Sequence, residues 1–359
     1  AGSFYFIALA VFAKIIRERM PGESAPVYLQ TKYDVRTTRL YSYAWIVYGF
    51  LYIPIQLKTV SSIIQIVLPG LNLMVAMFIG VTIAVIYTSF SGMKGASAVG
   101  RVVCIGIYVL LICFVFTTLP KFGGFSGLLG ELPEKYDSMG NMPTQRIVAW
   151  IVGGCISTAV MQAVLQPLLS AKSPEAARVG SILGYVIAAP ICFFTAICGM
   201  LSKASGADLG DGSTAFAYAI KTFSSPVFAG IIFAFATMII AATMATMMLA
   251  TGTIITNVYK TEINPDVDDA KVLKLSKTIT FVFAYLTLIP AFLIPSKSLT
   301  NLFLTLQHVA AAPVSFSILA GLLWKKTTKQ GAFWSMLTGM ITGVAWMLLG
   351  LTDIVEAVY

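Results

Sequence analysis

The sequence predicts an all-α fold, a bundle of helices that crosses a membrane many times. Hydrophobic residues make up 58% of the 359 positions and charged residues only 11%, with a mean hydropathy of +0.86. The apolar residues form runs of about 18 or more, the length that crosses the hydrocarbon core of a bilayer. The charged residues gather in the stretches between these runs. A soluble domain would need far more polar surface.

About ten apolar segments are expected to span the membrane, because each approaches the roughly 20 residues that a crossing needs. They form a single transmembrane domain over residues 1–359. In chain order they cover residues 2–17, 40–68, 71–90, 101–119, 147–169, 178–202, 227–257, 277–295, 299–323 and 331–350. The chain enters its first run without an initiator methionine or a signal-peptide pattern, so we expect an N-terminally truncated sequence.

The distribution of basic residues predicts the orientation. Of the 24 Lys and Arg residues, 17 fall on one side of the predicted bundle and 6 on the other, with Lys58 left within a span. The basic side is expected to be cytoplasmic, as in a multi-pass protein of the plasma or inner membrane. The net charge of +9 therefore indicates topology rather than a nucleic-acid partner.

Catalytic and metal-binding patterns are not found in the sequence. All 15 Asp and Glu residues fall in loops or at span ends, which argues against a carboxylate proton relay. The five cysteines lie in apolar runs without the spacing of a disulfide framework or a zinc site. We expect no enzyme, and no cofactor other than Na⁺ as a coupling ion.

Lys58 is predicted to lie deep in the membrane. It is about 11 residues from the Pro69–Gly70 turn, or roughly 16 Å along a helix. Ser61, Ser62 and Gln65 follow on the same face, and Pro54 is expected to kink the helix. Lys58 either bonds to backbone carbonyls or water, or it binds a ligand or acts as a gating charge.

Three other predicted spans carry polar residues. Segment 147–169 has Gly153–Gly154 followed by Thr158, Gln162 and Gln166, which indicates either a broken helix or close packing. Segment 227–257 is rich in threonine, which packing explains at least as well as an ion site. Segment 299–323 contains Gln307, Pro313 and the only histidine, His308, either a core residue or a proton carrier.

Four stretches in this order resemble the solute:sodium symporter family. They are "GESAPVYLQTKYDVRTTRL" at 22–40, "AVLQPLLSAKSPEAARVGSILG" at 163–184, "TGTIITNVYK" at 251–260 and "LLWKKTTKQGAFWSMLTGM" at 322–340. The resemblance covers nearly the whole chain. It implies the five-plus-five inverted-repeat fold of the LeuT type. It also implies that the first visible span corresponds to the second core helix of the family. The helix before it, part of the family's solute and sodium sites, is absent from this sequence.

Two departures from the family bear on ion coupling. The family's pair of hydroxyl residues in the eighth core helix falls on Ala241 and Ala242, whose methyl groups cannot bind Na⁺. Thr243 is the nearest substitute, if the helix is rotated or shifted. The Thr-Asp pair that opens the fifth core helix falls on Val99 and Gly100, beside Arg101.

A fixed positive charge can replace the electrostatic role of Na⁺. Buried lysine can release its proton, whereas arginine cannot. We therefore expect Lys58 to bind an anionic group of the solute or to cycle its proton. Proton-coupled and cation-independent transport are both open.

The predicted function is secondary active transport of a small organic solute by alternating access, with a transporter-like membrane sensor as the alternative. The solute is expected to be anionic or zwitterionic. The candidate solute-binding residues are Lys58, Ser62, Thr158, Met161, Gln162 and Gln307. The candidate ion-site residues are Ala241, Ala242, Thr243, Thr246 and Arg101.

Overall fold

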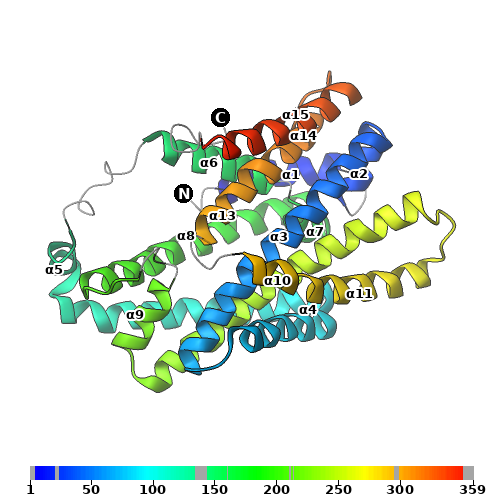
Figure 1. Cartoon of the computed structure of the whole chain (residues 1–359). Helices are drawn as coiled ribbons and strands as arrows, with labels where there is room; N and C mark the ends of the chain where they lie inside the picture. Colours follow the sequence, from blue (N-terminus) through cyan, green and yellow to red (C-terminus); the bar gives the residue numbers. More distant parts are fainter. Residues whose placement is uncertain are drawn as a thin grey trace.

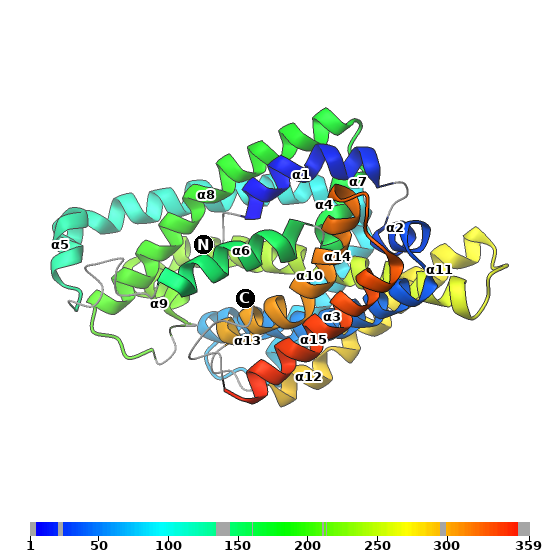
Figure 2. The same ribbon diagram turned by 90° about the horizontal axis from the view of Figure 1, so that it is seen from above.

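The computed structural model describes residues 5–20, 24–133, 144–159, 161–209, 212, 214–294 and 299–350. Within those ranges it describes the backbone but not the side chains of residues 5–7, 89–99, 146, 158–159, 269, 300–301 and 308. Every regular element in the described part is a helix. The helices form an elongated bundle (Figure 1, and from above in Figure 2). The all-α membrane fold predicted from the sequence is confirmed.

The helices follow one another along the whole described chain. They are α1 Tyr5–Arg19, α2 Ala25–Lys32, α3 Val35–Val67, α4 Leu73–Thr118, a 3₁₀ turn Leu119–Phe122, α5 Gly124–Gly130, α6 Thr144–Ala159, α7 Gln162–Leu169, α8 Pro174–Ala204, α9 Ala215–Phe223, α10 Pro226–Glu262, α11 Asp269–Leu286, α12 Leu288–Leu293, α13 Leu299–Leu306, a π turn Gln307–Ala311, α14 Ala312–Leu323 and α15 Lys329–Leu348.

The number of clear membrane spans is slightly lower than predicted. Seven helical segments in the described part are long and apolar enough to cross a membrane, and α6 with α7 makes an eighth, bent by 51°. The other two predicted spans are the 15-residue α1 and the stretch Leu73–Thr88 of α4. Both are helical, and each borders residues that are not described in full, with α4 itself continuing to Thr118.

Polar side chains mark where several long helices begin. In each case the residue before the helix accepts a hydrogen bond from a backbone N–H of the first turn, which satisfies one of the donors that a helix start leaves free. The capping residues are Asp34 for α3, Asn72 for α4, Ser173 for α8, Ser225 for α10 and Thr328 for α15.

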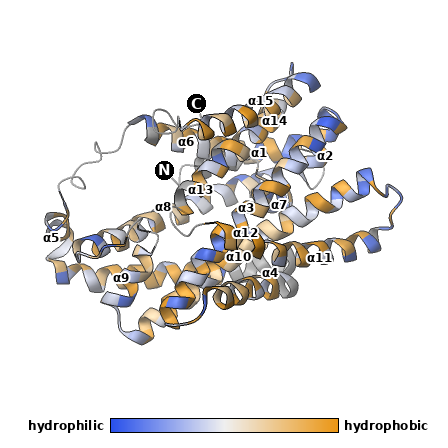
Figure 3. Ribbon diagram, in the orientation of Figure 1, coloured by the Kyte–Doolittle hydropathy of each residue, from blue (hydrophilic) through white to orange (hydrophobic). Residues whose placement is uncertain are grey.

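The bundle has two cores that share α10. One is formed mainly by α1, α3, α7, α10 and α14, and the other by α4, α8, α9 and α10. Glycines allow close approach between the helices: a Cβ at Gly49 of α3 would meet Thr251, and one at Gly252 would meet Thr280 of α11. Small residues at contacts are typical of membrane helices, because close approach strengthens dispersion contacts there. In Figure 3 the middle of the helices is mostly apolar, while α2 and the turn from α10 to α11 are hydrophilic.

Candidate functional site

A cavity of about 460 Å³ lies inside the bundle, where the break between α6 and α7 faces α3, α4, α10 and the π turn. Its walls are mostly apolar and aromatic, with a few hydroxyl and amide groups. The lining residues are Tyr52, Tyr87, Gly100, Val103, Cys104, Met161, Ala163, Val164, Ile239, Ala242, Thr243, Thr246, Met247, Phe303 and Gln307.

The broken helix predicted in segment 147–169 is present, but the break lies further along the chain. The helix continues through Gly153 and Gly154, because a helical glycine costs only about 1 kcal/mol and packing can offset it. The helix instead ends at Ala159 and restarts at Gln162, and Met161 between them lines the cavity. The sequence leaves a break at these glycines and close packing both open, and the helix does not break at them.

Groups on both sides of the break satisfy its exposed backbone. The Ser315 hydroxyl of α14 donates to the Ser157 carbonyl over 3.0 Å. The Met161 carbonyl accepts hydrogen bonds from the N–H groups of Val164 and Leu165, each with an N···O distance of 2.8 Å. Irregular backbone at membrane depth is tolerated only where it is covered by protein or lines a cavity, and this break does both.

The π turn brings a buried amide oxygen to the cavity. Gln307 is the first residue of this turn and is 8% exposed. Its Oε1 atom has no hydrogen-bond partner in the described part of the chain, and the residue lines the cavity. π turns inside membrane helices are frequent at functional sites. The His308 side chain lies outside the described residues, so both interpretations of it stay predictions.

One face of α10 forms the opposite wall. Ala242, Thr243 and Thr246 line the cavity, whereas Ala241 is 1% exposed and packs into the core. The Thr243 hydroxyl donates to the Ile239 carbonyl at 3.1 Å, and that of Thr246 donates to the Ala242 carbonyl at 2.9 Å. Each hydroxyl proton is therefore used within the helix, which leaves the oxygen atoms as acceptors toward the cavity.

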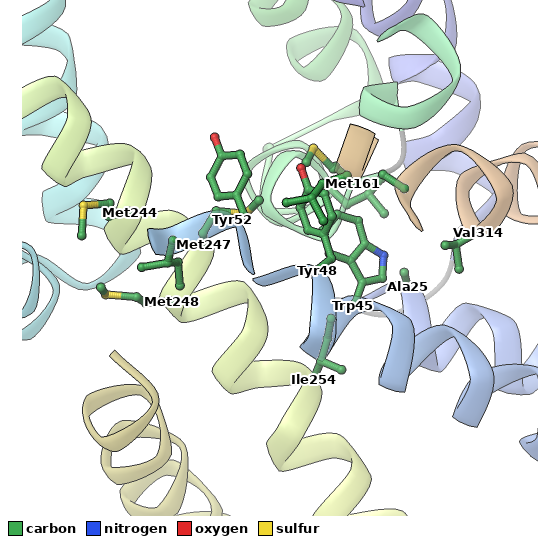
Figure 4. Packing of buried hydrophobic residues seen from close by; sticks show 14 of the residues in the cluster. Ala25, Trp45, Tyr48, Tyr52, Met161, Met244, Met247, Met248, Ile254 and Val314 are labelled. Atoms are coloured by element: carbon green, nitrogen blue, oxygen red, sulfur yellow. The ribbon is translucent and has the colours of Figure 1, made fainter. Parts of the chain in front are cut away.

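Aromatic residues that we did not predict complete the lining. Tyr52 of α3, Tyr87 of α4 and Phe303 of α13 lie around the cavity, and the Tyr52 and Phe303 rings are 5.7 Å apart. Figure 4 shows Tyr52 on α3 and Met247 on α10 together with Met161. The available signal was the spacing of Trp45, Tyr48 and Tyr52, which share one helix face.

The cavity brings together five of the predicted site residues, namely Met161, Gln307, Ala242, Thr243 and Thr246. Gly100 also lines it, but the neighbouring Arg101 is exposed. The described lining does not include Lys58, Ser62, Gln162, Ala241 or Arg101. The Thr158 side chain lies outside the described residues.

Three of the predicted solute ligands lie outside the described cavity lining and have other environments. Gln162 is fully buried. Its Oε1 atom accepts a hydrogen bond of 2.8 Å from the Ala25 N–H at the start of α2. Lys58 is 4% exposed in the middle of α3. The Ser62 hydroxyl donates to the Lys58 carbonyl, 2.9 Å away, and thus bonds to its own helix. The part of Lys58 in solute binding stays a prediction.

An apolar helix bundle with a mid-bundle cavity at a broken helix has the architecture of a secondary transporter. The chain belongs to the sodium:solute symporter family, whose sequence model matches residues 3–339. This confirms the resemblance inferred from the motifs. Its relatives are transporters, consistent with the prediction of a non-enzyme.

The similar proteins include symporters and a proline transporter. An uncharacterized symporter of Bacillus subtilis is 25% identical over 80% of this chain and 60% of its own length. The high-affinity proline transporter of Bacillus subtilis is 23% identical over 79% of this chain and 62% of its own. The sodium/pantothenate symporter of Escherichia coli is 25% identical over 77% of this chain and 58% of its own. The chain thus spans about three-fifths of the length of these relatives.

A solved structure shares the fold. The substrate-bound, outward-open structure of a Na⁺-coupled sialic acid symporter has a TM-score of 0.77 with this chain. The match covers 96% of this chain and 77% of the other, at 16% sequence identity. At that identity the likeness shows the LeuT-type fold alone.

Proposed function

We propose that this protein is a secondary active transporter that moves a small organic solute across the membrane by alternating access. The observation that carries the proposal is the cavity, since a broken helix, a π turn and one face of α10 meet there at mid-bundle. Discontinuous helices near the bilayer midplane form the solute sites of many secondary transporters. Family membership supports the same function.

The cavity lining favours a solute without net charge. Among the described lining residues none carries a charge. A buried anion without a charged partner is unfavourable, because it loses hydration that the protein does not replace. Of the two solute classes expected from the sequence, the lining supports the zwitterion. Proline in one relative's name is such a solute, while pantothenate in another is an anion.

Na⁺ is the proposed coupling ion, with proton coupling and cation-independent transport as the alternatives. Ala242 offers the cavity only a methyl group, but Thr243 and Thr246 present acceptor oxygens to it from the same helix face. We propose that these two hydroxyls replace the hydroxyl pair that the resemblance places at Ala241 and Ala242, two and four residues earlier on α10. We further propose that the basic loops face the cytoplasm of a plasma or inner membrane.

The proposal is tested by uptake into proteoliposomes of the purified full-length protein. Labelled proline, pantothenate, glucose and sialic acid are each offered with an inward Na⁺ gradient, and with K⁺ in its place at fixed pH. We expect Na⁺-dependent uptake of at least one zwitterionic or neutral solute. If the protein remains folded but takes up no zwitterionic or neutral solute, the choice of solute class is contradicted.

Variants of α10 separate the ion ligands from packing residues. Thr243→Val should lower Na⁺-dependent uptake about five- to thirtyfold, since one lost ligand oxygen costs on the order of 1–2 kcal/mol. Thr256→Val is the matched control, because Thr256 lies on α10 with its hydroxyl bonded to the Gly252 carbonyl and outside the lining. Equal losses in both variants would assign Thr243 to packing.

Lys58 is tested in the same assay. Lys58→Gln should lower uptake and flatten its dependence on pH if the lysine binds the solute or cycles a proton. Uptake like that of the wild type, with the same pH dependence, would remove Lys58 from the mechanism.

A further inference from the structure

A second cavity, of about 340 Å³, lies between α4, α10 and α11 and is here called the α11 groove. Helix α11 packs against both α10 and α4 (Figure 1). Leu273 and Phe281 of α11 line the groove and are 61% and 50% exposed, so it opens toward the surroundings of the bundle. Met248 of α10 and Val85 of α4 are buried and form its floor. In a protein that crosses a membrane, the surroundings of such a groove are lipid.

The α11 groove has a polar end and an apolar end. Lys277 lies at the polar end, one turn of α11 before Thr280. Thr280 faces Gly252 of α10, since a Cβ at Gly252 would meet the Thr280 side chain. Met248 lies one turn of α10 beyond that contact, on the side away from the α10–α11 turn. The two ends are therefore about 10 Å apart along the helices.

The polar end is positively charged. Lys277 is exposed, and no other charged side chain belongs to the part of the lining that the structure describes. Lys274, also exposed, lies one turn earlier on α11. Ser276 adds a hydroxyl that can donate a hydrogen bond to an anion. Lys277 is also the first residue of the predicted span 277–295, the level at which lipid headgroups meet the hydrocarbon core.

The rest of the groove suits hydrocarbon rather than a polar solute. The hydroxyls of Thr88 and Thr280 donate to the Ala84 and Ser276 carbonyls of their own helices, over 2.6 and 2.8 Å. Their protons are therefore not offered to a ligand. The other lining residues of α4 and α10 are apolar. A positive end and an apolar end complement an amphiphile with an anionic head and a hydrocarbon chain.

We propose that the α11 groove is a binding site for an anionic phospholipid of the surrounding bilayer. The phosphate lies at Lys277 and Ser276, and an acyl chain fills the apolar end beside Met248. Basic pockets between membrane helices on the cytoplasmic side bind such headgroups. The site is separate from the transport cavity, although Met247 and Met248, neighbours on α10 in Figure 4, line the cavity and the groove respectively. It does not depend on the proposed transport function, because lipid binding is measured without a solute.

The first test measures the charge preference of the site. The purified full-length protein in detergent is titrated with phosphatidylglycerol or phosphatidylcholine, and bound lipid is counted by native mass spectrometry. Lys277→Gln should weaken the tightest phosphatidylglycerol binding about fivefold, the contribution of one lysine near the membrane surface, and leave phosphatidylcholine unchanged. Lys326→Gln is the matched control, because it removes an exposed charge in the turn from α14 to α15, outside the lining. Equal binding of the two lipids by the wild type, or equal losses in the two variants, would overturn the proposal.

The second test fills the groove while the lysines stay in place. Ser276→Phe puts a ring where the headgroup is proposed to lie, and it should abolish the tightest phosphatidylglycerol binding. Thr278→Phe is the matched control on the same helix, since Thr278 is exposed and outside the lining. It should bind the lipid as the wild type does. Retained tight binding in Ser276→Phe, or the same loss in Thr278→Phe, would show that the lipid lies elsewhere and overturn the proposal.

Discussion

Several polar side chains inside the bundle complete the ends of helices. The Gln162 side chain accepts a hydrogen bond from the first N–H of α2. The Ser315 hydroxyl donates to the Ser157 carbonyl near the end of α6. The Arg19 side chain donates to the Leu322 carbonyl at the end of α14, at a distance of 2.8 Å. Helix ends leave backbone groups free, and these groups need partners where water is excluded. A buried polar residue in this protein therefore has a structural use that competes with ligand binding.

Gln162 allows the two uses to be separated. Gln162→Leu should lower the free energy of unfolding by about 1–3 kcal/mol, because the buried Ala25 N–H loses its acceptor. Gln162→Glu keeps an oxygen at that position and should recover part of the loss. Thermal unfolding of the purified protein measures both. If Gln162→Leu left the stability unchanged but weakened solute binding, Gln162 would be a solute ligand, as predicted from the sequence.

Asp34 should make the start of α3 sensitive to acid. Its carboxylate accepts from the Thr37 N–H over 2.8 Å. Burial alone would raise the pKa of Asp34, but the hydrogen bonds from Thr37 and the charges of Lys329 and Arg36 outweigh it and lower the pKa. A lowered folded-state pKa means that the contribution to stability is complete above the unfolded pKa of about 4 and disappears as the pH falls through the folded value.

Asp34→Ala should therefore lower the free energy of unfolding by about 1 kcal/mol at pH 7. The difference from the wild type should shrink below about pH 4, where the carboxyl group begins to be protonated in both states. Unfolding temperatures of the two proteins across this pH range measure the effect. A constant difference at all values would mean that the capping interaction does not depend on the charge of Asp34.

The residues of the site could be predicted only in part from sequence. Thr243, Thr246 and Gln307 were recognised because hydroxyl and amide groups stand out in apolar runs. Tyr52 was missed because an aromatic residue in a membrane helix is equally typical of a core. Helical spacing gives the face of a residue but not the helix that it meets, and so it could not place Gln162 against Ala25.

At the scale of the helices, sequence was a better guide. All ten predicted segments are helical, because a long apolar run in a bilayer has no other way to pair its backbone groups. The sequence could not place the break between α6 and α7, which lies at Met161 and not at Gly153 and Gly154. Tertiary contacts decide that position: the Ser315 hydroxyl pairs the carbonyl of Ser157 just before the break.

The contact of α15 with the first turn of α14 gives a prediction at the scale of helices. A Cβ at Gly339 would lie 2.8 Å from Pro313 Cβ, on a ring that cannot rotate away. Gly339→Ala should therefore lower the free energy of unfolding by about 1–3 kcal/mol, as overpacking usually does. Thermal unfolding measures the change.

Gly180→Ala in α8 is the matched control for this substitution. A Cβ at Gly180 meets nothing within 4 Å, so the change should stabilise the helix by up to about 1 kcal/mol. If both variants behaved alike, the tight contact between α15 and Pro313 would not limit stability.

At the scale of the whole molecule, the helices give the bundle two chemically different ends. The turn between α10 and α11 belongs to the end for which the sequence predicts 17 of the Lys and Arg residues, and it is among the hydrophilic parts in Figure 3. The opposite end includes the turn after α8 at Ser205. Because positive charges near span ends resist translocation, the basic end should be cytoplasmic.

Single cysteines at the two ends test this orientation in the full-length protein. Asp266→Cys lies in the exposed α10–α11 turn and Ser205→Cys in the exposed turn after α8. Both are made without the native cysteines and expressed in intact cells treated with an impermeant maleimide. Only the cysteine at 205 should be labelled, and the one at 266 should react after the membrane is permeabilised. The reverse pattern would place the basic end outside.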